Sequence, residues 1–133
     1  MRVRDVMTKD VVTLVESEKL LVADDVMRLG RIRHLPIVDA SGKLVGIVTQ
    51  RDLFHSGLLR VLGSGASERS AREVIVVGEA MHPDVVTTTP DAPLAEAARV
   101  MLDHKVGCLV VLEHERIVGI LTETDFVKLA AGR

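Results

Sequence analysis

The sequence contains no tryptophan and no tyrosine, and its only phenylalanines are Phe54 and Phe126. Proteins that bind single-stranded nucleic acid stack the bases on aromatic side chains, and such platforms are nearly absent here. The 17 lysines and arginines are outnumbered by 19 aspartates and glutamates, for a net charge of −2. Without a basic excess there is little to attract a phosphate backbone. These shortages argue against nucleic acid as a partner, and a bound base would have to lie between aliphatic side chains.

Cysteine and long apolar runs are equally scarce. The single cysteine, Cys108, cannot form an internal disulfide, which fits a reducing compartment. The first ten residues lack the apolar core of a signal peptide, and no apolar run approaches the ~18 residues of a membrane span. We therefore expect a soluble, cytoplasmic protein with no membrane partner, and Cys108 as a core residue of an apolar strand.

The motifs of common metal sites and enzymes are also missing. The sequence has no Cys-x-x-Cys or His-Glu-x-x-His spacing for zinc, no phosphate-binding loop, no dinucleotide fingerprint and no nucleophile elbow. No general base is paired with a nucleophile. We expect no metal site, no catalytic residue, no required cofactor and no enzymatic activity. The five histidines, which could in principle bind a metal, lack this ligand spacing; they are His34, His55, His82, His104 and His114.

What the sequence does contain is an internal duplication. Hydrophobic residues make up 47% of its 133 positions, enough for one domain or two small halves that share a core. Met7 matches Met81, a shift of 81 − 7 = 74, and residues 10–13 (DVVT) return as 84–87. Only two copies at such a long period indicate a duplicated domain rather than a solenoid. The expected organisation is a first repeat over 1–62, a linker over 63–73 and a second repeat over 74–133.

Each copy has the same predicted order of elements: strand, helix, strand, strand, helix. Short β-rich stretches come first, at 11–15 and 85–89. Ser17 and Asp91 are the expected caps of the helices that follow. The next strands form hairpins, and residues 72–77 are the expected lead-in strand of the second copy. The helical core stripes should be Leu20, Ala23, Val26 and Met27, repeated as Leu94, Ala97, Val100 and Met101.

Both copies end in the same motif, GIVTQRD at 46–52 and GILTETD at 119–125. Each joins an apolar strand directly to a predicted helix. A helix start exposes backbone N–H groups and the positive end of the helix dipole, which suits an anion such as phosphate. An aspartate one turn into the helix can accept two hydrogen bonds from a vicinal diol such as ribose. The spacing therefore suits a nucleotide.

The same residues have a purely structural interpretation. Thr-x-x-Asp is close to a capping box, in which Thr49 and Thr122 cap their helices and the aspartates support the same turn. The two roles are compatible, since a cap can yield to a ligand. The duplication favours a ligand, but both interpretations stay open from the residues alone.

A family resemblance rests on several motifs in a fixed order. They are Met7-Thr8 and Met81, the Val-Val-Thr strands, residues 33–39 and the two Gly-x-x-Thr-x-x-Asp ends. In this pattern the chain resembles a pair of CBS domains, the tandem arrangement also called a Bateman module. The resemblance implies an α/β fold of two β-α-β-β-α repeats, related by a pseudo-twofold axis, with clefts between the repeats and frequent dimers. It also implies a regulatory protein that binds AMP, ADP, ATP, NAD or S-adenosylmethionine.

The resemblance further implies roles for individual positions. Asp52 and Asp125 would each hold a ribose, and Thr49 and Thr122 would lie near the phosphate. Two residues of the first hairpin would line the base pocket, and an early strand of the opposite repeat would cover the adenine. The residues concerned are Pro36 and Ile37 for the pocket, and Val12 or Val86 for the cover.

The two copies differ around the phosphate position. The first has Arg33, His34 and Arg51, whereas the second has Gly107, Cys108 and Thr124 in their places. Arginine offers both charge and paired donors to a phosphate. We therefore expect the Asp52 site to bind a phosphorylated ligand more tightly than the Asp125 site. The alternative is that Arg33 and His34 face solvent or contact a dimer partner.

The predicted function is the sensing of an adenine nucleotide, with AMP or ATP as first candidates. The bound state would pass to a homodimer interface or to an unidentified regulated protein. The competing hypothesis is a ligand-free structural or dimerisation module, in which the two Thr-x-x-Asp motifs serve only as caps.

Overall fold

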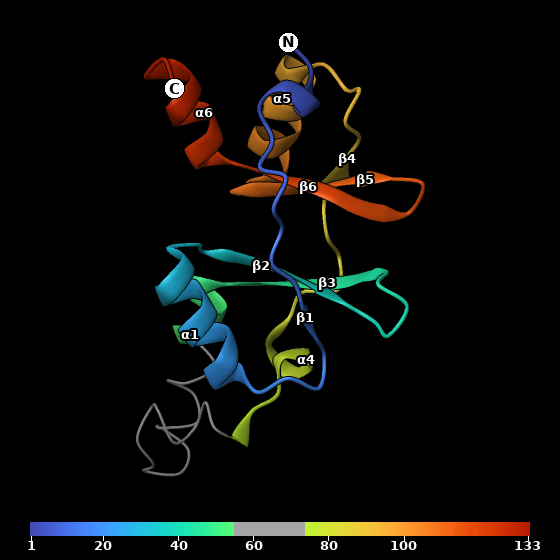
Figure 1. The fold of residues 1–133 in the computed structure, drawn as a ribbon, viewed down its shortest axis with the longest axis vertical. Helices are drawn as coiled ribbons and strands as arrows, with labels where there is room; N and C mark the ends of the chain where they lie inside the picture. The colour runs from blue at the N-terminus through green and yellow to red at the C-terminus, as the bar shows by residue number, and fades with distance from the viewer. Residues whose placement is uncertain (55–73) are drawn as a thin grey trace. The chain divides into compact units, whose positions relative to one another are not determined.

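A computed structural model describes residues 1–54 and 74–133 and divides the chain into two compact units. The first-repeat unit is Val12–Asp84, and the second-repeat unit combines Met1–Val11 with Val85–Arg133. In Figure 1 the blue N-terminal segment lies beside the orange elements of the second repeat. The first residues of the chain thus fold with the second repeat rather than with their own. The expected linker over 63–73 lies outside the described residues.

The first-repeat unit is a three-stranded sheet with helices on one face (Figure 1). β1 runs parallel to β2, and β2 pairs antiparallel with β3. A helix begins directly after β3, and its residues 50–54 are described. The bounds are β1 (Leu14–Val15), α1 (Leu20–Gly30), β2 (His34–Val38), β3 (Leu44–Thr49) and α4 (Val77–Ala80).

The second-repeat unit repeats this plan. Its sheet order is β4-β5-β6, with the same parallel and antiparallel pairs, and its helices again lie on one face (Figure 1). The bounds are η1 (Val3–Asp5, a 3-10 helix), β4 (Thr87–Thr88), α5 (Leu94–His104), β5 (Cys108–Glu113), β6 (Arg116–Thr122) and α6 (Glu123–Ala130). The predicted α/β class and the order of elements are confirmed in both copies.

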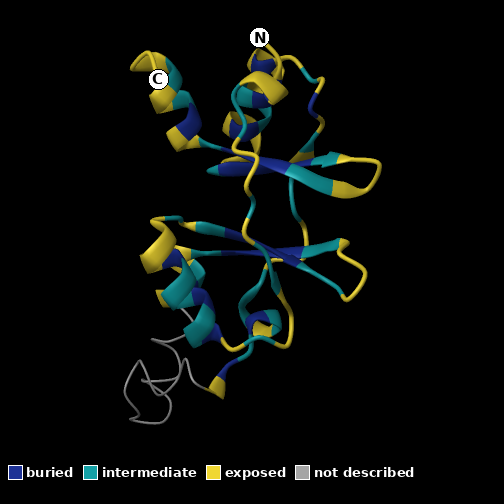
Figure 2. Cartoon of the chain, viewed as in Figure 1, coloured by how far each residue is buried: buried dark blue, intermediate teal, exposed yellow. Residues whose placement is uncertain are grey.

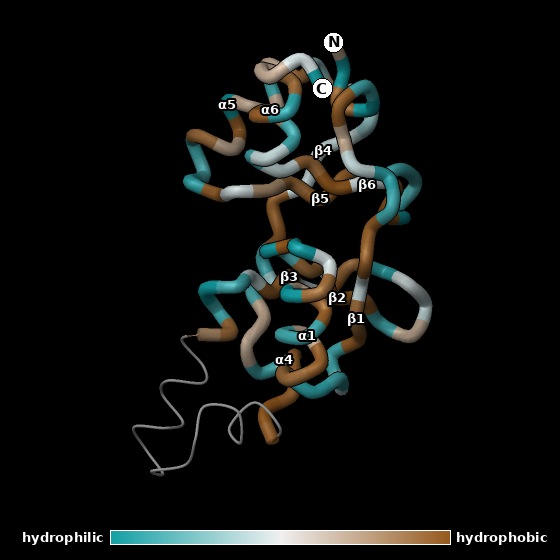
Figure 3. The backbone as a smooth tube through the Cα atoms, turned by 60° about the vertical axis from the view of Figure 1, so that its left-hand side comes forward, coloured by the Kyte–Doolittle hydropathy of each residue, from teal (hydrophilic) through white to brown (hydrophobic). Residues whose placement is uncertain are grey.

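Each unit has its own core between sheet and helices. The predicted helical stripes supply it: Leu20, Ala23 and Met27 of α1 are buried, as are their counterparts in α5. They pack against alternate residues of the central strands, such as Leu35 and Ile37 of β2. Buried residues are concentrated on the strands and on the helix faces turned toward them (Figure 2). In Figure 3 hydrophobic, brown backbone runs along β1 and much of β2, and several of the turns are hydrophilic and teal.

The predicted helix caps Ser17 and Asp91 are wrong. The residues at the N-cap positions of α1 and α5 are Lys19 and Pro93, and neither makes a side-chain cap. Backbone carbonyls replace the caps, because the N–H of Leu20 donates to Ile75 O at 2.8 Å and that of Leu94 to Met1 O at 2.9 Å. Amides that have no partner within their own helix are thus satisfied by residues far away in sequence.

The carbonyls come from two equivalent stretches, residues 1–8 and 75–82, which we call the leading segments. The predicted lead-in strand over 72–77 is wrong where the structure describes it. Val76 forms a single bridge with Lys19, and α4 begins at Val77. The N–H of Val77 donates to Glu18 O at 2.7 Å and that of Gly78 to Glu16 O at 2.9 Å. These bonds hold the short helix α4 in place. The 3-10 helix η1 has the equivalent position in the other unit.

The end of each leading segment pairs with the last strand of its unit's sheet. Thr8 and Ile120 exchange two backbone hydrogen bonds of 2.9 Å, and His82 and Ile47 exchange bonds of 2.9 and 3.0 Å. Both contacts pass over a glycine. A Cβ at Gly46 would lie 2.6 Å from the sulfur of Met81 and 3.0 Å from the carbonyl oxygen of His82. A Cβ at Gly119 would meet Met7 and Thr8 in the same way, so the motif glycines make room for the leading segments.

We predict that Gly46→Ala destabilises the protein by about 1–3 kcal/mol, the usual cost of overpacking. The added methyl group meets backbone as well as a flexible side chain, so the contact cannot relax fully. Urea unfolding measures the change. Gly30→Ala is the matched control, because its Cβ would lie 3.6 Å from Ile32 in ordinary contact, and alanine is favoured in a helix. A Gly46→Ala protein as stable as the wild type would contradict the close approach.

Cys108 is predicted to be inert in the folded protein. Its side chain is buried at the start of β5, and burial, assisted by the nearby negative charge of Glu123, raises the pKa of the thiol to about 12. The thiolate is the reactive form, so at about pH 8 a thiol reagent should react on the order of a thousandfold more slowly than with an unfolded cysteine of pKa about 8.5. Titration with a disulfide reagent, with and without denaturant, measures this. Fast reaction without denaturant would show that the thiol is accessible.

Candidate functional site

The motif of the first-repeat unit places Asp52 at the start of the helix after β3. One carboxylate oxygen, Oδ2, accepts hydrogen bonds from the N–H of Thr49 at 2.8 Å and from its hydroxyl at 2.9 Å. The N–H of Asp52 points back to the threonine hydroxyl at 3.3 Å. The second oxygen, Oδ1, lies 2.7 Å from Nε2 of His82. Since an ionised carboxylate only accepts, the histidine nitrogen is the donor.

Asp125 has the equivalent position at the start of α6. Its Oδ2 accepts from the N–H of Thr122 at 2.9 Å and from the Thr122 hydroxyl at 3.3 Å, as in a capping box. Its Oδ1 accepts from the hydroxyl of Thr8 at 2.9 Å. Thr8 and His82 are equivalent in the repeat, since 82 − 8 = 74. Each aspartate is therefore held by its own threonine and by one residue of a leading segment.

The structural interpretation of the motif is thus correct as far as the contacts go, and it leaves limited room for a ligand. A carboxylate offers about four acceptor positions, and three donors already lie on each aspartate. A ribose diol brings two further hydroxyl groups. One could use the remaining position on Oδ1, but a second would have to displace a donor already there. Binding of a diol at either carboxylate would therefore compete with the contact to the leading segment.

The two sites differ in exposure. The side chain of Asp52 is 14% exposed and that of His82 is 62% exposed, whereas Asp125 is 6% exposed and is the only charged residue classed as buried in the described part of the chain. The donor that faces Asp52 is thus an exposed side chain, while Asp125 is more enclosed.

The charged residues predicted near the first phosphate position come together. His34, the first residue of β2, pairs with Thr49 in the sheet. The carbonyl of Arg33 accepts a hydrogen bond from the N–H of Gln50 at 3.0 Å. The side chains of Arg33 and Arg51 are exposed. Sheet register and turn geometry thus gather these residues around the Thr49 end of the motif.

The four residues expected around the base differ in burial and in the unit that contains them. Ile37 is fully buried in the apolar core under α1, so its side chain belongs to that core. Pro36 pairs with Ile47 and is also buried, on the alternate face of the strand. Val12 is 47% exposed ahead of β1, in the unit that carries Asp52. Val86 packs on the second core, and its carbonyl accepts from the N–H of Val110 at 3.3 Å.

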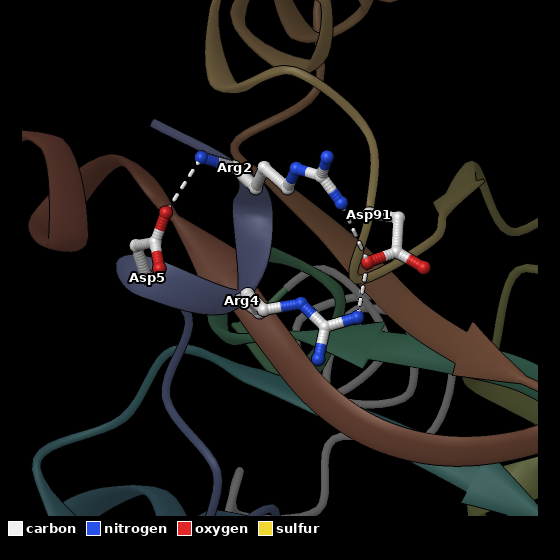
Figure 4. Close-up of polar contacts among 4 residues, drawn as sticks. All are labelled: Arg2, Arg4, Asp5 and Asp91. Carbon is white, nitrogen blue, oxygen red and sulfur yellow. Dashed lines mark hydrogen bonds and ion pairs between the residues drawn. The ribbon is translucent and has the colours of Figure 1, made fainter.

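Sequence reasoning missed the polar contacts that hold η1 in place. Arg2 and Arg4 both donate to Oδ1 of Asp91, Arg2 at 3.2 Å, and the N–H of Arg2 donates to Asp5 at 2.8 Å (Figure 4). The hydrogen bond from Arg4 is the main reason that the pKa of Asp91 lies below its usual value. Asp91, the predicted cap of α5, therefore binds Arg2 and Arg4 instead of capping the helix. No local pattern in the sequence joins residues almost ninety positions apart, so nothing short of the fold indicates this contact.

Two other features are absent from residues 1–54 and 74–133. No group of three or more histidine, cysteine, aspartate or glutamate side chains could hold a metal ion there. None of the helices in those ranges has the length and apolar character needed to cross a membrane.

Comparison with known sequences gives relatives along almost the whole chain. The homoserine O-acetyltransferase of Methanococcoides burtonii is 35% identical over 128 residues, which are 96% of this chain but 24% of that protein. The chain spans roughly a quarter to two-fifths of the length of the first curated relatives that it matches.

Solved structures cover the chain at similar lengths. A protein assigned to acetoin utilization (AcuB) from Vibrio cholerae is 42% identical with a TM-score of 0.82, covering 99% of this chain and 91% of that one. The CBS domain pair of protein MJ0100, solved with 5′-methylthioadenosine and S-adenosyl-L-methionine, is 28% identical with a TM-score of 0.80 and covers 99% and 97%. CBSX2 in complex with AMP is 27% identical with a TM-score of 0.79 and covers 98% and 96%.

The family model described as "CBS domain" matches residues 3–58 and again 77–132. These two matches include both Thr-x-x-Asp motifs and residues 3–8 and 77–82 of the leading segments. The chain therefore belongs to the CBS-domain family and carries two copies of that domain.

Proposed function

We propose that this protein is a regulatory module that binds an adenine nucleotide at the helix starts carrying Asp52 and Asp125. AMP and ATP are the first candidates, and NAD and S-adenosylmethionine are the next. The observation that carries the proposal is the pair of carboxylates at the two helix starts. Thr49 or Thr122 anchors Oδ2 of each, and among the described residues one replaceable side chain, His82 or Thr8, holds Oδ1. Two structurally similar CBS proteins were solved with adenosine compounds, which supports the choice of ligand class.

In this proposal different residues bind the ribose, the phosphate and the base of the ligand. Oδ1 of Asp52 would accept from a ribose hydroxyl, while Thr49 and the positive end of the helix that follows it would face the phosphate. Arg33 and Arg51 are exposed beside that position and would supply its positive charge. The side chain of Ile37 is committed to the core, so the base would meet Pro36 and other residues on the alternate face instead.

The second site would bind more weakly. Asp125 is buried, and Thr124 stands where the first site has Arg51. A phosphate would find less positive charge there, and a ribose would have to reach a more enclosed carboxylate. We therefore propose that the Asp125 site prefers a less charged ligand or fills only at higher concentration.

We propose a regulatory rather than catalytic role. Some relatives are named as acetyltransferases, but this chain covers 24% of such a protein, so that activity does not carry over to it. The signal would pass to a homodimer interface or to a regulated protein in the cytoplasm. A ligand can shift such an equilibrium only by its differential affinity for the two states.

A ligand-free structural or dimerisation module is the second candidate. The observation that favours it is that each carboxylate already accepts three hydrogen bonds from the chain itself. In that case the motifs would act only as caps, and no adenine nucleotide would stabilise the protein.

We predict that AMP or ATP stabilises the wild-type protein in a concentration-dependent way. At ten times its dissociation constant a ligand adds about 1.4 kcal/mol, which should raise the Tm of a chain of this size by about 5 °C. A thermal-shift panel of AMP, ADP, ATP, NAD and S-adenosylmethionine measures this. Asp52→Asn should reduce the affinity for the best ligand about tenfold or more, and Asp125→Asn should reduce it less, by at most about threefold.

Asp103→Asn is the control, since Asp103 lies exposed on α5 outside both motifs. A panel with no shift for any compound would favour the structural module. Equal loss of affinity in Asp52→Asn and Asp125→Asn would contradict the proposed difference between the sites.

A further inference from the structure

The two carboxylates are held by side chains of different chemistry at equivalent positions of the repeat. His82 reaches Oδ1 of Asp52 at 2.7 Å, and Thr8 reaches Oδ1 of Asp125 at 2.9 Å. A threonine hydroxyl carries no charge at any ordinary pH, whereas an imidazole changes its charge between about pH 5 and pH 8. The two contacts therefore differ in whether their donor is able to carry a charge.

Backbone pairing fixes where the histidine sits. His82 exchanges two hydrogen bonds with Ile47 of β3, only five residues before Asp52 in the chain. Its backbone is thus anchored to the sheet, while its side chain is 62% exposed and can turn away from Asp52 into water. His82 thus combines a backbone fixed by pairing with an exposed imidazole ring. A ligand could displace such a ring from Asp52 without disturbing the sheet.

Several other charged or titratable groups lie on the elements that meet at this point. On the leading segment and its continuation they are Glu79 and Asp84, on the helix after β3 Arg51, and at the start of β2 Arg33 and His34. Asp52 is the group in direct hydrogen-bond contact with the ring. The sign of any response is therefore set first by the negative charge of Asp52.

We propose that His82 is an internal, proton-dependent competitor of the ligand for Oδ1 of Asp52. The inference rests on the proposed function, because it concerns the same carboxylate. A protonated ring makes a charge-assisted hydrogen bond to Asp52, roughly twice as strong as a neutral one. The second hydroxyl of a ribose diol must break that bond to reach Oδ1, so affinity at Asp52 falls as the pH falls. The Asp125 site, opposed by Thr8, lacks this dependence.

The test is an NMR titration of ¹⁵N-labelled protein with AMP at about pH 6 and about pH 8. The amides of Thr49 and Thr122 donate to the two carboxylates, so their signals report the two sites separately. The comparison is between wild type and His82→Gln, since glutamine keeps a neutral donor and cannot be protonated. The phosphate of AMP titrates near pH 6, but it does so equally in both proteins, and the ratio of their affinities removes it.

We expect the affinity of wild type relative to His82→Gln, followed at Thr49, to fall about fivefold between about pH 8 and about pH 6. At Thr122 the ratio should stay within about twofold. His114→Asn is the control: His114 lies in the β5–β6 turn with φ 52°, where asparagine is well tolerated. This variant should keep the wild-type pH response.

The outcomes separate the two proposals. A pH-independent ratio at Thr49, with AMP bound to both proteins, would overturn the role of His82 and leave the proposed function standing. Binding by His82→Gln but not by wild type at about pH 6 would support both. If neither protein binds AMP at either pH, the proposed function fails and the competitor role fails with it.

Discussion

The structure depends on two small backbone pairings, Thr8 with Ile120 and His82 with Ile47. Each attaches the leading segment of one repeat to the sheet of the unit built mainly from the other. Upstream of the pairing, the same segment supplies the carbonyl that satisfies the first amide of α1 or α5. At the pairing itself it delivers a side chain to the motif aspartate. Neither repeat thus completes the start of its first helix, α1 or α5, or all the contacts of its motif carboxylate from its own residues.

The motif glycine and the motif aspartate are linked through this pairing. Gly46 and Gly119 leave room for the methionine and the backbone of the leading segment, and that close approach brings the following residue to the carboxylate. The Thr-x-x-Asp motif is then a cap and a candidate binding site at once. A ligand would have to compete with contacts that already stabilise the fold, so its affinity would depend on which residue the leading segment presents.

Much of this architecture could be predicted from the sequence, because hairpins and amphipathic helices follow from local periodicity. The β3 strand and the buried stripe of α1 are examples. The helix caps could not be predicted, since the carbonyls of Ile75 and Met1 come from distant residues that no local pattern connects to Leu20 and Leu94. The carboxylates were identified as site candidates, but their partners Thr8 and His82 were not, for the same reason. The roles of the site residues in ligand binding stay predictions.

The most direct test of the central claim is native-state hydrogen exchange at the amides of Thr8, Ile47, His82 and Ile120. All four donate in the two pairings. If the leading segments are integral to the units, these amides should exchange with protection close to that of the buried strands, as expected for groups that open only with their cooperative unit. Exchange of the Thr8 and His82 amides at the rate of an unstructured peptide, with the strands still protected, would contradict the account.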